Sequence, residues 1–194
     1  MLRHVAKYRP QTPSVSIDLP MTLSPQTLSE DDRRLVAGWA AACAERVLPL
    51  FESERPDDGR PRAAIDRARA YSEGRLDTAT EIRRRFADGG AARGLTSRAA
   101  AAAASAAGQA SAVCHMGAHA LGAAAYAVKA VSLASPDTPG AAAGEMRWQL
   151  SLLTTQARTA LLCLPPVGQN RSGPLGPGLL SSGQVGQIIA AFQA

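Results

Sequence analysis

The chain has 194 residues, a length that suits one domain with a real hydrophobic core. Alanine fills about a fifth of the positions and aromatic residues only 4%, which is typical of closely packed helices and argues against a sheet. The net charge of +5 permits binding to anions without requiring it. We therefore predict an all-α protein, a compact Ala-rich bundle of about five to seven helices.

The composition also argues against secretion and membrane insertion. Residues 1–20 lack the apolar core of a signal peptide, and polar residues interrupt the Ala-rich run 99–134, so we do not interpret it as a membrane span. An odd number of widely spaced cysteines predicts buried free thiols at Cys43, Cys114 and Cys163. We expect a cytoplasmic protein that does not bind membranes.

The chain divides by composition into three parts. Residues 1–27 are rich in proline and are predicted to form a flexible arm, with Met1 or Met21 as the native start. Residues 28–164 form the predicted helical domain. Residues 165–194 are a Gly/Pro-rich tail that could fold back over the body and includes a short apolar helix at 184–193.

The first half of the domain contains three predicted helices. The first begins after the N-cap Ser29 and is kinked or ended by Pro49. The second begins at Pro61, and the third spans residues 77–87. Each has inward residues at helical spacing: Leu35, Trp39, Cys43 and Val47 in the first, Ile65, Ala68 and Tyr71 in the second, and Ile82 and Phe86 in the third.

The second half begins with a long Ala-rich element that starts near Thr96 or Ser97 and ends before Pro136. One helix of that length is too long for a compact domain, so we expect a bend near Gly108 or between Gly117 and Gly122. Two further helices follow at 141–153 and 155–164. The core positions of the first of them are Met146, Leu150 and Leu153.

A pair of histidines is the most distinctive feature of the Ala-rich run. His115 and His119 are four residues apart, a spacing that stacks them on one face of a helix, with Tyr126 further along. We take these three residues as a candidate ligand or partner face. Cys114 is adjacent and is counted with them, although it points about 100° away on a helix.

This face is open to three interpretations. The histidines could simply pack and hydrogen-bond within the bundle, or the face could bind a small ligand or a partner. They could also bind a divalent metal, although no cofactor is expected and the HExxH motif is absent because position 116 is Met. A third metal ligand would come from another helix, and the candidates are Glu45, Asp66, Glu73 and Glu145.

Two other features have both a structural and a functional interpretation. Ten arginines against five acids between Arg60 and Arg98 suggest solvated helix faces, an acidic protein partner or, with less support, nucleic acid. Trp39 and Trp148 are predicted core anchors, and the segment 147–149 alternatively presents an interface. The sequence contains no pattern that supports catalysis.

Five segments of the chain are distinctive when taken together: 31–35 (DDRRL), 39–52 (WAAACAERVLPLFE), 60–65 (RPRAAI), 115–127 (HMGAHALGAAAYA) and 147–150 (RWQL). With these segments the chain resembles the actinobacterial "putative immunity protein" family of bacterial polymorphic toxin systems, over about residues 28–164.

The resemblance implies a non-catalytic protein that binds and neutralises a cognate toxin, as in toxin–antitoxin pairs, and it provides no catalytic residues to carry over. The alternative is a helical protein, conceivably an enzyme, that binds a metal or a small molecule through His115, His119 and Tyr126. A third possibility is a homo-oligomer built by packing the small-residue faces of two chains together.

Overall fold

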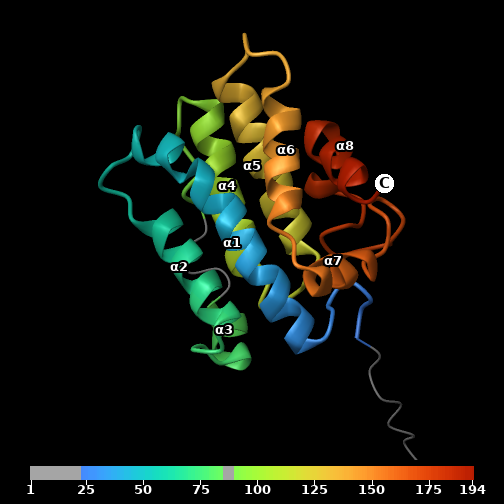
Figure 1. The fold of residues 1–194 in the computed structure, drawn as a ribbon. Helices are drawn as coiled ribbons and strands as arrows, with labels where there is room; N and C mark the ends of the chain where they lie inside the picture. Colours follow the sequence, from blue (N-terminus) through green and yellow to red (C-terminus); the bar gives the residue numbers. More distant parts are fainter. Residues whose placement is uncertain (1–22, 85–89) are drawn as a thin grey trace, which may run out of the picture.

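The computed structural model describes residues 23–84 and 90–194, and within these ranges all regular structure is helical (Figure 1). The all-α prediction is confirmed, although the described residues form more helices than expected. The elements are α1 (Glu30–Glu52), α2 (Arg60–Ser72), α3 (Thr78–Arg84), α4 (Arg98–Ala112), α5 (His119–Ala134), α6 (Ala141–Ser151), α7 (Thr155–Leu162), the 3-10 helix η1 (Leu179–Ser181) and α8 (Gly183–Phe192).

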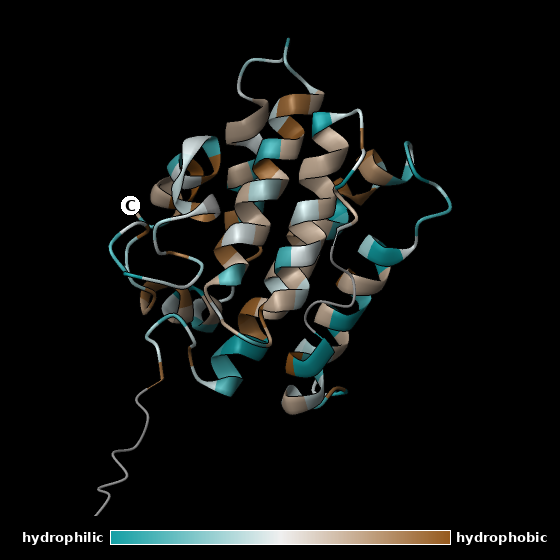
Figure 2. Cartoon of the chain, turned by 180° about the vertical axis from the view of Figure 1, so that it is seen from behind, coloured by the Kyte–Doolittle hydropathy of each residue, from teal (hydrophilic) through white to brown (hydrophobic). Residues whose placement is uncertain are grey.

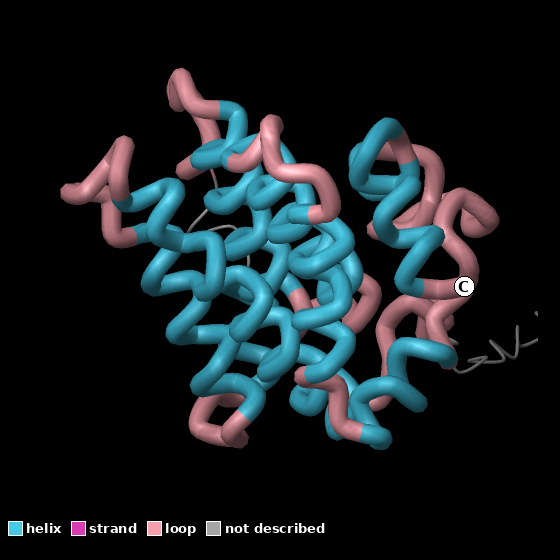
Figure 3. Tube along the Cα trace, turned by 45° about the horizontal axis from the view of Figure 1, so that its top comes forward, coloured by secondary structure: helices cyan, strands magenta, loops and turns pink. Residues whose placement is uncertain are grey.

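The helices α1, α4 and α5 form the centre of the bundle (Figures 1 and 3). The helix α2 covers α1 and α4, α6 and α8 cover α5, and α7 lies against α1. Alanines such as Ala103, Ala107 and Ala124 are fully buried at this centre. Their small side chains let the helix backbones approach closely, which is how a chain with few aromatic residues builds a core.

Local signals in the sequence locate the helix starts well. The side chains of Ser29, Ser97 and Thr154 accept hydrogen bonds from the backbone N–H three residues on, which satisfies donors that a helix terminus otherwise leaves unpaired. Pro49 does not end α1, which continues to Glu52. The interior positions predicted for α2 are buried.

Three sequence-based predictions about buried residues were wrong. Leu35 is 42% exposed and Val36 takes its place in the core of α1. Cys163 is exposed because it caps the end of α7 at the surface, whereas Cys43 and Cys114 are buried as predicted. In α6 the most deeply buried side chains are polar, Glu145 and Gln149, and the predicted core leucines are only half-buried. Phe86 lies outside the described residues.

The Ala-rich run breaks over residues 113–118, which overlap the second predicted interval, 117–122, at Gly117 and Ala118. Gly108 stays inside α4 with open space around it. At the break, the backbone N–H of Gly117 donates to Thr27 and that of Ala118 to Gln26. A Cβ on Gly117 would lie 2.4 Å from Cδ1 of Leu28. Glycine is therefore needed here because the N-terminal segment packs directly on this turn.

Residues 23–27 belong to the predicted arm, and Gln26 among them is almost fully buried. Its side-chain amide donates to the carbonyl of Ser172 at 2.7 Å and accepts from the backbone N–H of Leu175 at 2.8 Å. Gln26 therefore joins the start of the described chain to the C-terminal loop through its side chain and to the α4–α5 turn through its backbone carbonyl. The rest of the predicted arm, residues 1–22, lies outside the described residues.

The C-terminal segment packs against α5 and carries buried apolar residues. Leu175 and Ile189 are fully buried, and Leu180 and Val185 nearly so. Seen from behind, the central helices are mostly pale or brown and the hydrophilic teal gathers on the outer helices and loops (Figure 2). Among the helices of residues 23–84 and 90–194, none is both long and apolar enough to cross a membrane.

Candidate functional site

The two histidines do not share a helix face. His115 lies in the turn between α4 and α5, and His119 is the first residue of α5. The prediction of a stacked pair was wrong because it assumed that the helix continues through residues 113–118. The two rings are still near each other, since the charge of His115 contributes to lowering the pKa of His119.

The imidazole of His119, at the start of α5, hydrogen-bonds to a side chain of α4. Its Nδ1 lies 2.8 Å from Oε1 of Gln109, and because this oxygen can only accept, Nδ1 carries the proton. Burial, together with the charge of His115, lowers the pKa of His119 to about 4. His119 is therefore neutral at pH 7, with Nε2 left as an acceptor.

Tyr126 lies further along α5, where it lines a hollow that His119 does not reach. This hollow lies between α4 and α5, and its other polar residues are Arg98, Ser105 and Lys129. Tyr126 is 6% exposed, and burial raises the pKa of its hydroxyl. The Nζ atom of Lys129 lies 5.8 Å from the centre of the ring, a cation–π distance. His119 does not line this hollow, so the predicted face is divided between two places.

Cys114 belongs to neither place. Its thiol is buried and donates to the carbonyl of Ser111 at 3.2 Å. Burial, together with the negative charge of Glu81, raises the pKa of Cys114 to about 11, so the thiol stays protonated and is a poor nucleophile at pH 7. Glu81 is itself buried in an ion pair with Arg67 at 2.9 Å.

Among the residues that the structure describes, no third ligand is placed to hold a metal at the histidines. Within the described ranges, no group of three or more His, Cys, Asp or Glu side chains is placed to hold an ion. Three of the four carboxylates suggested by the sequence are in ion pairs elsewhere, and Asp66 is on an exposed face of α2. The pairs are Glu45 with Arg69, Glu73 with Arg75 and Glu145 with Arg46.

Residues from two of the family-like segments meet where α1 packs near α6. Nε of Arg46 lies 2.8 Å from Oε2 of Glu145, and its guanidinium lies 4.1 Å from the ring centre of Trp148. The amide of Gln149 donates to Glu145, and its backbone carbonyl accepts from the indole N–H of Trp39 at 2.8 Å. Sequence reasoning missed this network, and the i, i+4 spacing of Glu145 and Gln149 was the signal that could have indicated it.

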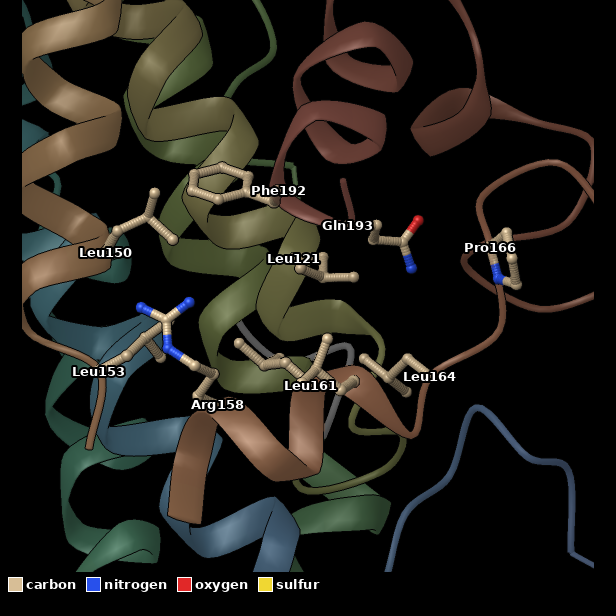
Figure 4. A pocket seen from close by; sticks show the side chains of 10 residues that line it. Leu121, Leu150, Leu153, Arg158, Leu161, Leu164, Pro166, Phe192 and Gln193 are labelled. Carbon is tan, nitrogen blue, oxygen red and sulfur yellow. The ribbon is translucent and has the colours of Figure 1, made fainter. Parts of the chain in front are cut away.

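Two apolar hollows lie on either side of α7. The first, which we call the α7 groove, runs between α1 and α7 and is lined by Leu35, Trp39, Ala42, Leu152 and Ala157, among others. Leu35 and Leu152 are 42% and 40% exposed along it. The second, the leucine cavity, lies between α6, α7 and the end of α8 (Figure 4). Neither hollow was predicted, because each is assembled from segments far apart in sequence.

Comparison with known families finds a match, which covers most of the chain. The sequence profile of the family described as Imm-5 like putative immunity protein matches residues 26–156. The chain belongs to this family. The Imm-5 like region spans the network around Glu145 and one wall of the α7 groove, and it ends within α7, before α8. No match was found among curated proteins or among solved structures.

Proposed function

We propose that this Imm-5 like protein is an immunity protein that binds and neutralises a cognate bacterial toxin without catalysis. Membership of the family is the observation that carries the proposal. The helical scaffold supports it, because α1, α4 and α5 are held by a tightly packed alanine core and present a preformed surface. A rigid surface binds with a smaller entropic cost than a flexible one.

The α7 groove is the surface that fits this role best. Leu35 and Leu152 line one hollow with partly exposed apolar side chains, and the buried Trp39 lines it as well. Apolar residues gathered in a hollow are typical of the centre of a protein interface, where a partner's side chain inserts and excludes water. We expect a toxin with acidic groups around its own binding surface, since this chain carries a net charge of +5.

The test is to co-express the protein with the toxin domain encoded beside it and to measure cell survival and the affinity of the purified pair. Leu35→Asp and Leu152→Asp are expected to weaken binding by about tenfold or more, because each places a charge in a desolvated contact. Both positions are already partly solvated, so the melting temperature should change little.

Leu23→Asp is the matched control, because Leu23 is 73% exposed and does not line the α7 groove. It should protect as well as the wild type. If the wild-type protein neither binds nor protects, the immunity role is wrong. If it protects and both groove variants protect equally well, the role stands and the binding surface lies elsewhere.

A further inference from the structure

The leucine cavity is an apolar hollow beside α7 that opens to solvent on one side. It has a volume of about 240 Å³, which exceeds the roughly 150 Å³ of an engineered cavity that holds benzene. Leu121 and Leu164 are nearly fully buried at its floor. Side chains from α6, α7 and the end of α8 complete the wall (Figure 4), among them Leu150, Leu161 and Phe192.

Arg158 is a charged residue in the otherwise largely apolar lining of the cavity. Arg158 projects from α7, and its guanidinium points toward the space that Leu150 and Leu153 also face (Figure 4). No ion pair or side-chain hydrogen bond of Arg158 is found among the described residues. The sequence explains why: Glu145 is the one acidic side chain between residues 138 and 194, and it is already paired with Arg46.

We propose that the leucine cavity binds a small amphiphilic acid, with its apolar chain or ring among the leucines and its carboxylate on Arg158. An apolar pocket with one well-placed polar group is the usual design of a small-molecule site. Guanidinium and carboxylate match in geometry and form charge-assisted, often bidentate hydrogen bonds. Most of the cavity wall lies outside α1, so this site is distinct from the α7 groove and does not depend on the immunity role.

The concave shape favours a free molecule over a partner's surface. The floor of the cavity is buried, and its wall comes from segments around three helices. Leu162, which also lines the cavity, is 71% exposed and marks its opening to solvent. A ligand that enters the cavity would approach Phe192, whose ring lies edge-on to Trp39 with 6.0 Å between the ring centres. Binding should therefore alter tryptophan fluorescence.

The experiment titrates the full-length protein with octanoate, with octanol and octylamine as uncharged and oppositely charged analogues. Calorimetry and tryptophan fluorescence are expected to show saturable binding of octanoate to one site. Octanol should bind more weakly and octylamine should not bind. Arg158→Gln should weaken octanoate by about tenfold and leave octanol unchanged. Absence of octanoate binding, or equal binding of octanoate and octylamine, would overturn the proposal.

Two further variants distinguish binding of octanoate in the cavity from nonspecific attraction of the anion to the basic protein. Arg147→Gln removes an exposed arginine of α6 that does not line the cavity, and it should bind octanoate like the wild type. Leu161→Phe fills part of the space and should weaken octanoate and octanol alike. An Arg147 variant that loses as much affinity as the Arg158 variant would show nonspecific attraction and would contradict the assignment.

Discussion

The imidazole of His119 shows how burial can change the chemistry of a residue. Its Nδ1–H donates to Gln109 at 2.8 Å. The ring is buried between α4 and α5, where its charged form is poorly solvated. A pH switch near neutrality needs a histidine whose pKa lies closer to 7. His119 instead has a pKa of about 4, which favours a structural role for the ring.

This low pKa predicts a dependence of stability on pH. An unfolded histidine takes up a proton near pH 6.5, whereas folded His119 does so only near pH 4. Between these values the unfolded state binds more protons, so the free energy of unfolding falls as the pH is lowered. Urea unfolding at about pH 7 and pH 4.5 should show a loss of about 2 to 3 kcal/mol from this group.

His119→Gln removes the titrating group and keeps a polar side chain, so its stability should fall less over the same interval. The difference between the two proteins isolates His119 from the carboxylates, which titrate in both. An equal loss in the variant and in the wild type would mean that His119 is solvated and titrates normally.

At the scale of elements, α1 and α6 are joined by a buried ion pair whose partners differ in exposure. The side chain of Glu145 is 2% exposed and that of Arg46 is 47% exposed. Trp148 stacks beneath the guanidinium, and Gln149 donates to the other carboxylate oxygen. Removing the arginine therefore leaves a buried charge without its partner, whereas removing the carboxylate leaves an arginine that water can reach.

We accordingly expect Arg46→Ala to destabilise the protein more than Glu145→Gln does, by about 3 kcal/mol against about 1 to 2 kcal/mol. Chemical denaturation of the two single variants and of the double variant measures both costs and their coupling. Glu145→Gln should partly rescue Arg46→Ala, because it neutralises the stranded charge. Equal costs without coupling would indicate that the pair is as well solvated as a surface salt bridge.

The turn between α4 and α5 shows why a local pattern can mislead about an element. The run from Ser97 to Ala134 is helical by propensity throughout, and Gly108 is tolerated within α4. The helix breaks at 113–118 because backbone N–H groups there bond to Gln26 and Thr27, and because Leu28 needs the space that a side chain at Gly117 would occupy. These partners are about 90 residues away in sequence, so no window of residues could indicate them.

At the scale of the whole molecule, the C-terminal segment is part of the packed structure although the family match ends at residue 156. Leu175 and Ile189 are fully buried, and Gln26 ties the loop before η1 to the other end of the described chain. Burying an aliphatic side chain contributes about 1.5 to 3 kcal/mol, so several such residues are a large part of a typical domain stability.

A chain that stops after Pro166 should therefore unfold at a lower temperature or fail to fold, as measured by thermal circular dichroism. Leu175→Ala is a smaller change to the same segment. It should lower the free energy of unfolding by about 2 to 5 kcal/mol, because it removes buried apolar surface and leaves a cavity. If the shortened chain and this variant both melt like the wild type, the segment is an appendage and its burial contributes nothing to stability.

The sequence by itself determined the helical class, most of the helix boundaries and the N-cap at Ser29. These features depend on contacts within one turn of the chain, where propensity, capping hydrogen bonds and proline or glycine act locally. The buried positions at Trp39, Cys43 and Val47 could also be predicted, because helical spacing alone aligns them on one face.

Only the tertiary structure decided where the Ala-rich run breaks, which of its polar residues meet, and that α6 buries a carboxylate. Each of these depends on a partner distant in sequence: Thr27 for Gly117, Gln109 for His119 and Arg46 for Glu145. The same holds for the α7 groove and the leucine cavity, whose walls come from separate helices. The periodicity of a sequence indicates which face of a helix is apolar. The free energy of burying a polar side chain depends instead on its hydrogen-bond or ion-pair partner. When that partner is distant in sequence, only the folded structure brings the two groups together.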